Sequence, residues 1–192
     1  TLLASVLGTS LGLIAGYKRG KIDTILMRLV DAQRAFPLLF LALAIVALFG
    51  PGITQLVLIL GIWGWAEYGR LVRGVTLSIR EREFVAAAQA IGAPSTRIII
   101  RHIFPNLVPP IIVLSTFFIA QLIVLEGALS FLGWGIPPPE SSWGRMLAEG
   151  RDKIGIAWWL GIFPGLAISV VVLAFNLVGD RLRDILDPRL RT

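Results

Sequence analysis

The sequence predicts an all-α fold, a polytopic bundle of transmembrane helices. Of its 192 residues, 56% are hydrophobic and only 16% are charged, whereas soluble domains usually have about 25% charged residues. The charges are bunched, which leaves uncharged stretches at residues 1–17, 35–66, 102–125 and 154–179. Because a helix that crosses a bilayer needs about 20 mainly apolar residues, these stretches predict membrane spans. The composition therefore excludes a soluble enzyme, a nucleic-acid-binding protein and a disordered scaffold as leading interpretations.

Five spans are expected in one transmembrane domain that occupies the whole chain, residues 1–192. They cover approximately residues 1–16, 34–49, 53–70, 106–130 and 156–179. The second and third span form a hairpin, because their apolar run is too long for one helix and contains Gly50-Pro51-Gly52, a strong turn signal. The chain opens inside an apolar run without a charged leader, so we expect it to be amino-terminally truncated and to lack at least one earlier span.

The first expected span contains three glycines spaced four residues apart, Gly8, Gly12 and Gly16. This spacing places them on one face of a helix, where another helix backbone can approach closely. We interpret them as a helix-packing seam; a ligand path is the alternative.

Basic residues are distributed unequally between the two ends of these spans. Fifteen lie in the segments 18–34, 70–101 and 181–191, whereas Arg145, Arg151 and Lys153 lie at the opposite ends. The positive-inside rule places the fifteen in the cytoplasm, which explains the basic pI of about 10.7. An aromatic belt near the outer face would then contain Trp134, Trp143, Trp158 and Trp159. Asp23 and Asp31 lie among the basic residues and are expected to be solvated ion-pair partners.

The chain lacks the residues that most membrane enzymes and nucleotide-binding proteins need. It has no cysteine and a single histidine, His102, which excludes thiolate chemistry and a histidine metal cluster. No phosphate-binding G-x-x-x-x-G-K-[ST] segment occurs, since Gly20-Lys21 is followed by isoleucine. We therefore expect no cofactor or metal here, and ATP, if it is used, is bound by a separate subunit.

The longest polar interruption, residues 80–105, predicts a cytoplasmic helix–turn–helix. Phe84, Ala87, Ala88 and Ile91 share one helical face, and Gly92 is a natural helix stop. A second short helix, capped by Ser95, is expected to run through residues 98–100 and to stop near Pro105. On this pattern alone, the small apolar surface either enters a cleft on a partner or packs against the chain's own spans.

This segment resembles the EAA loop of ABC importer permeases. The matching residues are Ala87-Ala88, Gly92 four residues after Ala88, and Pro105 thirteen residues after Gly92. Five further segments, in order along nearly the whole chain, resemble the dipeptide, oligopeptide and nickel branch of these permeases. They are residues 80–85 (REREFV), 101–106 (RHIFPN), 128–133 (ALSFLG), 143–147 (WGRML) and 187–189 (DPR).

The resemblance implies a MetI-like permease fold in which the EAA loop forms coupling helices that dock into a groove on a cytoplasmic ATPase. It assigns this role to Glu83, Phe84, Ala86, Ala87, Ala88, Ile91, Gly92, Arg101, His102 and Pro105. The sequence departs from the motif at its glutamate, which is Ala86 here, and at its isoleucine and leucine, which are His102 and Phe104. Glu83, three residues before Ala86 on nearly the same helix face, is a candidate substitute for the glutamate.

The resemblance also implies the assembly and the location. The partners are a second homologous permease subunit, two cytoplasmic ATPase subunits, an extracytoplasmic solute-binding protein and the lipid bilayer, with no nucleic acid. The location is the inner membrane of a bacterial or archaeal cell, which the chain crosses several times. The outer loop 131–155, which contains three consecutive prolines and an expected helix from Ser142 to Glu149, either contacts the binding protein or is a plain connector.

Three polar side chains inside the expected spans are candidates for the translocation path. Glu126 is an acid deep in an apolar run, where an unpaired charge costs several kcal/mol, so it is a functional candidate. It either meets a cationic solute or is a structural glutamate near the rim of its span, and we favour the structural role. Gln121 and Asn176 are weaker candidates, because amides in spans more often bond neighbouring helices.

These observations together predict a permease subunit that forms half of the path for a small, peptide-like solute and catalyses no covalent chemistry. The alternatives are an independent channel and a membrane-embedded enzyme. An enzyme would need a nucleophile–base pair or an acidic dyad within the spans, which the sequence does not offer. Peptides, nickel chelates, glutathione and opines fit this branch equally, and no residue distinguishes among them.

Overall fold

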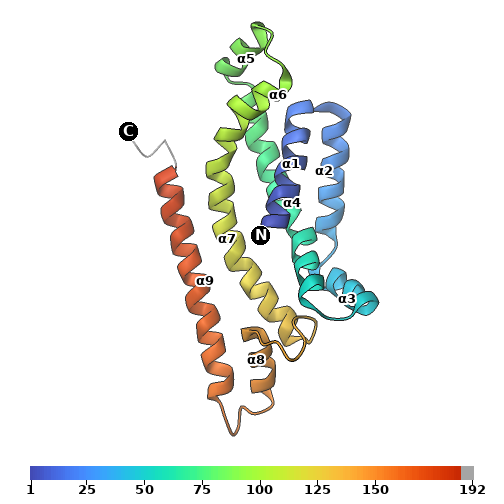
Figure 1. Ribbon diagram of the computed structural model, residues 1–192, viewed down its shortest axis with the longest axis vertical. Coiled ribbons are helices and arrows are strands. Elements are labelled where there is room, and N and C mark those ends of the chain that lie inside the picture. Colours follow the sequence, from blue (N-terminus) through green and yellow to red (C-terminus); the bar gives the residue numbers. More distant parts are fainter. Residues whose placement is uncertain (187–192) are drawn as a thin grey trace. The chain divides into compact units, whose positions relative to one another are not determined.

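The computed structural model describes residues 1–186, and every regular element in this range is a helix (Figure 1). The elements are α1 (Leu2–Lys18), α2 (Gly20–Ala35), α3 (Leu38–Phe49), α4 (Ile53–Arg80), α5 (Glu83–Ala90), α6 (Ser95–Ile98), the π-helical segment η1 (Ile99–Ile103), α7 (Phe104–Phe131), α8 (Trp143–Arg151) and α9 (Trp159–Leu186). The predicted all-α class is confirmed for these residues. The segment 187–189 and the basic residues Arg189 and Arg191 of the sequence analysis lie outside them.

Two helical stretches within residues 1–186 are long and apolar enough to cross a membrane, Ser95–Phe131 and Trp159–Leu186. Helices α2 and α3 meet this standard only as a pair, so the structure offers two or three candidate spans. Helix α3 has 12 residues, about 18 Å of helix, which is shorter than the bilayer's hydrocarbon core of about 30 Å. The count of five spans remains a prediction.

Several helix ends differ from the expected ones for identifiable reasons. The expected arm 34–49 begins at Leu38, because Pro37 precedes the helix in an extended conformation. Helix α4 continues to Arg80 rather than ending near residue 70, since charged residues end an apolar run without ending a helix. The turn at residues 50–52 is confirmed; Gly50 has a positive φ of 75° and donates its N–H to the Val46 carbonyl at 2.8 Å.

The described chain forms two compact units, whose boundaries fall within α4, α7 and α9. The first contains residues 36–62 and 116–180 together with Thr1, and the second contains residues 2–35 and 63–115 together with the chain from Arg181.

In the second unit, α1 packs against α4 through the glycine seam, Gly8, Gly12 and Gly16. A Cβ atom built on Gly12 would lie 3.0 Å from the Gly69 Cα, and one on Gly16 would lie 2.8 Å from the Thr76 Cβ. Such approaches are too short for a real side chain, so only glycine permits this helix spacing. The predicted packing seam is confirmed.

A second core in this unit fixes the segment between α4 and α7. Its buried residues come from α4, α5, α6, η1 and α7, and they are Val72, Ile79, Val85, Ala88, Ile98, Ile103 and Leu107. The expected stop at Pro105 is wrong, because α6, η1 and α7 are consecutive. A proline lacks the N–H of a normal helical bond and crowds the preceding turn. A π-helical turn directly before Pro105 is a known way for a helix to adapt to such a defect.

The first unit is built around α3, the start of α4 and the end of α7. Its buried core consists of Ala42, Leu56, Ile59, Leu60 and Leu129. A helix was expected from Ser142 to Glu149, and α8 confirms one there, beginning at Trp143 with Ser142 as its N-cap; the Ser142 Oγ accepts a hydrogen bond from the Arg145 N–H at 3.2 Å.

Candidate functional site

The best candidate for a docking surface is the short helix α5, whose two sides differ sharply. Val85 and Ala88 point into the core between α4 and α7, at 0% and 6% exposure. Phe84 and Ile91, in contrast, are 41% and 85% exposed, and Ala87 between them is also exposed. The sequence pattern predicted Ala88 on the same apolar face as Phe84, Ala87 and Ile91. The structure corrects this, because Ala88 belongs to the chain's own core. We call Phe84, Ala87 and Ile91 the coupling surface.

Gly92 ends this helix with hydrogen bonds that require its positive φ of 78°. Its N–H donates to the Gln89 carbonyl at 2.9 Å, and the N–H of Ala93 donates to the Ala88 carbonyl at 3.1 Å. This pair of bonds is a Schellman motif, in which glycine is the favoured residue. Ser95 was predicted to cap the next helix, and this prediction is wrong. Ser95 is the first residue of that helix, directly after Pro94.

Of the other sequence-predicted residues of the loop, His102 contacts the coupling surface and the rest are exposed. The His102 ring, half-buried in η1, contacts the Phe84 ring with 6.2 Å between their centroids. Arg101 and Pro105 are exposed, as are Ala86 and Glu83. Within residues 1–186 the structure gives Glu83 no ion pair, so its carboxylate faces solvent.

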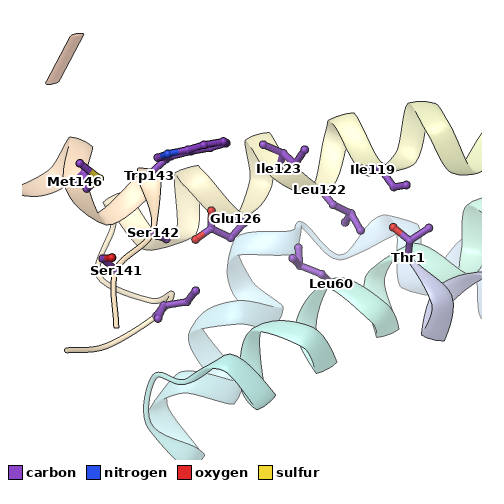
Figure 2. Close-up of a pocket in the computed structure, with 11 residues that line it drawn as sticks. Thr1, Leu60, Ile119, Leu122, Ile123, Glu126, Ser141, Ser142, Trp143 and Met146 are labelled. Atoms are coloured by element: carbon purple, nitrogen blue, oxygen red, sulfur yellow. The ribbon is translucent and has the colours of Figure 1, made fainter. Parts of the chain in front are cut away.

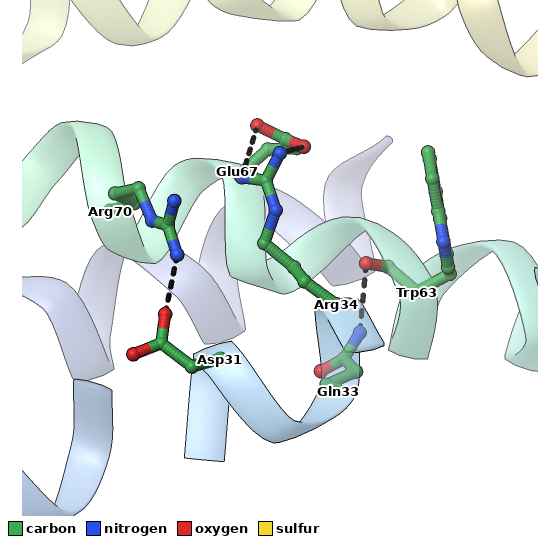
Figure 3. A network of polar contacts seen from close by, with 6 residues as sticks. All are labelled: Asp31, Gln33, Arg34, Trp63, Glu67 and Arg70. Carbon is green, nitrogen blue, oxygen red and sulfur yellow. Dashed lines mark hydrogen bonds and ion pairs between the residues drawn. The ribbon is translucent and has the colours of Figure 1, made fainter. Parts of the chain in front are cut away.

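A polar network joins α2 to α4 (Figure 3). Its three drawn contacts are the Asp31–Arg70 ion pair at 2.6 Å, the Arg34–Glu67 ion pair at 3.1 Å, and a hydrogen bond from the Gln33 Nε2 to the Trp63 carbonyl at 2.9 Å. In the two ion pairs the higher residue number on α2 goes with the lower one on α4 (Asp31 with Arg70, Arg34 with Glu67), so the network joins antiparallel segments. Exposed pairs of this kind contribute about 1 kcal/mol or less each.

Asp23 makes a more protected pair further along the same two helices. Its two carboxylate oxygens accept from the Nε and Nη2 of Arg73, and its side chain is only 14% exposed. The expectation of a solvated partner is therefore wrong for Asp23, although it holds for Asp31, whose side chain is 66% exposed. The sequence shows acids in α2 and bases in α4, but only antiparallel packing reveals which of them pair.

A cavity of about 540 Å³ in the first unit brings Glu126 together with the segment before α8 (Figure 2). Its polar lining consists of Thr1, Glu126, Ser141 and Ser142, and the rest is apolar, including Leu122 and Trp143. The Ser130 hydroxyl donates to the Glu126 Oε1 at 2.6 Å. The carboxylate thus has a partner on its own helix and also lines a cavity, while Gln121 and Asn176 do not line it.

A family model described as "binding-protein-dependent transport system inner membrane component" matches residues 8–192. A protein of Brucella suis biovar 1, whose name describes a peptide transport system permease, is 46% identical over 99% of this chain and 64% of its own length. The dipeptide transport system permease protein DppC of Alkalihalophilus pseudofirmus is 45% identical over 98% of this chain and 62% of its own. The glutathione transport system permease protein GsiD of Pectobacterium atrosepticum is 44% identical over 100% of this chain and 64% of its own. This chain therefore spans less than two thirds of the length of these relatives.

Among solved structures, a chain of the MetNI methionine ABC transporter, determined in inward facing conformations, is similar in fold. The TM-score is 0.78, and the match covers 97% of this chain and 88% of that chain at 16% identity. At this identity the likeness shows the fold alone, which confirms the MetI-like architecture. Since the family match covers nearly every residue, the chain belongs to the binding-protein-dependent transport system inner membrane component family.

Proposed function

We propose that this chain is part of a permease subunit in an ATP-driven importer, where it forms half of the path for a small solute. An extracytoplasmic binding protein delivers the solute, and two cytoplasmic ATPase subunits bind ATP. A second homologous permease subunit forms the other half of the path. The relatives named for dipeptide and glutathione transport support a peptide-like solute.

One observation supports this function above the others: an exposed apolar surface on a short helix between α4 and α7. Ile91 is 85% exposed and Phe84 is 41% exposed. Both lie in the polar segment 80–105, and the exposure of apolar side chains to water is unfavourable. The surface coincides with the segment that resembles the EAA loop. Docking of an ATPase would bury it, with Glu83 and Arg101 as exposed polar residues beside it.

An independent channel or a membrane-embedded enzyme would not need such a surface. Neither would retain an ATPase subunit through α5. Co-purification of an ATPase with the full-length permease therefore separates the importer from both alternatives.

The five spans and their orientation are part of the proposal. Helix α1, the segment 34–49 that contains α3, and helices α4, α7 and α9 would cross the bilayer. The fifteen basic residues then face the cytoplasm and the outer loop 131–155 faces outward.

Single cysteines in this cysteine-free chain test the orientation. Ser95→Cys, beside the coupling surface, is expected to resist a membrane-impermeant maleimide in intact cells, whereas Ser141→Cys in the outer loop is expected to react. Both positions are exposed, so permeabilised cells should label both and serve as the control. Labelling of Ser95→Cys but not of Ser141→Cys in intact cells would contradict the proposed orientation.

We also propose Glu126 as a candidate for the translocation path, with Gln121 and Asn176 as weaker candidates, and for Glu126 we favour a structural role near the rim of its span. Glu126→Gln keeps an acceptor for the Ser130 hydroxyl and removes only the charge. It is expected to reduce uptake of a labelled dipeptide by less than about tenfold, which corresponds to less than 1.4 kcal/mol. Glu149→Gln, which breaks an exposed pair with Arg145 on α8, is the matched control. Complete loss of uptake in Glu126→Gln, with ATPase binding intact, would make the carboxylate essential for transport.

A further inference from the structure

Helices α7, α8 and α9 enclose an apolar groove that the proposed function does not use. Two adjoining hollows of about 450 and 510 Å³ form it, and they share Phe131, Leu147 and Gly165. Figure 1 shows α8 beside the ends of α7 and α9. All three helices contribute these residues within the first unit, so the groove belongs to one compact body.

The helices that line the groove approach one another closely at several glycines. Near α8, a Cβ on Gly144 would lie 2.6 Å from the Gly127 Cα of α7, and one on Gly150 would lie 2.8 Å from the Gly161 N of α9. Further along the two long helices, a Cβ on Gly179 of α9 would lie 2.6 Å from the Thr116 Oγ1 of α7. Between these contacts, the two long helices leave space that protein side chains do not fill.

The chemistry of the groove is asymmetric. The hollow of about 510 Å³ is lined only by apolar residues and glycines. The hollow of about 450 Å³ adds Ser169, whose hydroxyl donates to the Gly165 carbonyl at 2.9 Å, and one charged residue, Arg151. The groove thus has an apolar length and a single cation at one end, which matches an amphiphile with an anionic head and a hydrocarbon tail.

Arg151 is placed to bind an anion at this end. Its guanidinium lies over the Phe131 ring, 5.5 Å from the centroid. Its Nε pairs with Asp152 at 3.2 Å, in an ion pair whose side chains are 65% and 76% exposed. An exposed pair between neighbours in sequence is weak, and the planar guanidinium keeps further donors for phosphate oxygens.

The length of the groove matches one leaflet of a bilayer. From Trp158, just before α9, to Ser169 the chain rises about 16 Å, roughly half of the 30 Å hydrocarbon core. Trp158, which lines the Arg151 end, is 53% exposed, as expected of a tryptophan at a membrane interface. Helix α9 itself is a candidate span with only 6% of its most apolar window buried, so this chain leaves most of that window uncovered.

We propose that this groove binds one acyl chain of an anionic phospholipid, with the phosphate on Arg151 and the chain along α9 between α7 and α8. In the proposed orientation the lipid belongs to the outer leaflet. Lipid binding at this site requires only that the chain crosses a bilayer. The proposal can therefore hold or fail independently of the identity of the solute and of ATPase docking.

The test uses the assembled full-length transporter in nanodiscs of phosphatidylethanolamine that contain a photoactivatable phosphatidylglycerol with the reactive group on its acyl chain. In the wild type, mass spectrometry is expected to find cross-links on α7 or α9 beside Leu147. Gly161→Leu and Gly165→Leu fill the groove from its wall, and a Cβ at these positions meets no atom closer than 3.7 Å. Both variants are therefore expected to fold and to lose these cross-links.

Two further variants make the result specific. Gly74→Leu places the same side chain on α4, where a Cβ meets no atom within 4 Å, and it is expected to keep the cross-links. Arg151→Gln is expected to weaken cross-linking about tenfold, the effect of losing one charge-assisted hydrogen bond.

Two outcomes would overturn the proposal. They are the absence of cross-links in the groove of the wild type, and equal cross-linking in Gly165→Leu and Gly74→Leu. ATPase co-purification in the same preparation reports separately on the proposed function.

Discussion

Replacing Gly12 by leucine is expected to separate α1 from α4 and to leave little folded permease. The hydrogen atoms of Gly12 face the Gly69 backbone, and a Cβ would overlap the Gly69 carbonyl and lie 3.0 Å from its Cα. Backbone cannot move aside as a flexible side chain can, so the cost should reach or exceed the upper end of the usual 1–3 kcal/mol for overpacking. Thermal unfolding of the purified protein in detergent, with the yield of inserted protein, measures the effect.

Gly74→Leu is the matched control for this prediction. Gly74 lies on α4 as Gly69 does, but a Cβ there meets no atom within 4 Å. Because leucine favours a helix more than glycine does by almost 1 kcal/mol, Gly74→Leu should unfold at or above the wild-type temperature. Equal unfolding temperatures for the Gly12 and Gly74 variants would refute the seam.

The second large effect is expected at the coupling surface, where Ala87→Trp should abolish binding of the ATPase. Ala87 is exposed between Phe84 and Ile91, so an indole there leaves the chain's own core intact and obstructs only a partner. A cost of about 3 kcal/mol would weaken docking roughly 150-fold. Co-purification of the ATPase and solute-stimulated ATP hydrolysis measure the loss, and Ala87→Ser, which keeps the volume small, should retain both.

Ala88→Trp should fail in a different way, because Ala88 is 6% exposed and packs in the core with Val85 and Ile98. We expect the tryptophan to disorder residues 80–105, which limited proteolysis would detect as new cleavage. In Ala87→Trp the same segment should stay resistant. Loss of ATPase binding accompanied by cleavage in both variants would mean that Ala87 is structural and not part of a docking surface.

The sequence revealed the helices more reliably than their ends or their partners. Long apolar runs identified α1, α7 and α9, because helix formation and membrane burial both follow from local composition. The ends were harder to predict. Helix α4 continues past its apolar run to Arg80 because its charges find partners on α2, and this depends on residues about 40–50 positions away.

The candidate site shows the same division between local and distant information. The Schellman motif at Gly92 follows from a local pattern and was predictable as a helix stop. Which side of α5 is buried was not predictable from the sequence. Ala87 and Ala88 are adjacent alanines, and only the packing of α4, η1 and α7 distinguishes them. The groove beside Arg151 was also invisible in the sequence, since its residues come from three helices.

The most direct test of the central claim, that α5 docks on an ATPase, is protection of a single cysteine at its most exposed apolar position. Ile91→Cys is placed in the full-length permease after any cysteine outside this cysteine-free chain has been replaced. It should react readily with maleimide when the permease is purified alone, because Ile91 is 85% exposed. In the complex with its ATPase subunits, the reaction at Ile91→Cys should slow at least about tenfold, while the reaction at Ser141→Cys stays unchanged. Equal reactivity of Ile91→Cys with and without the bound ATPase would contradict the account.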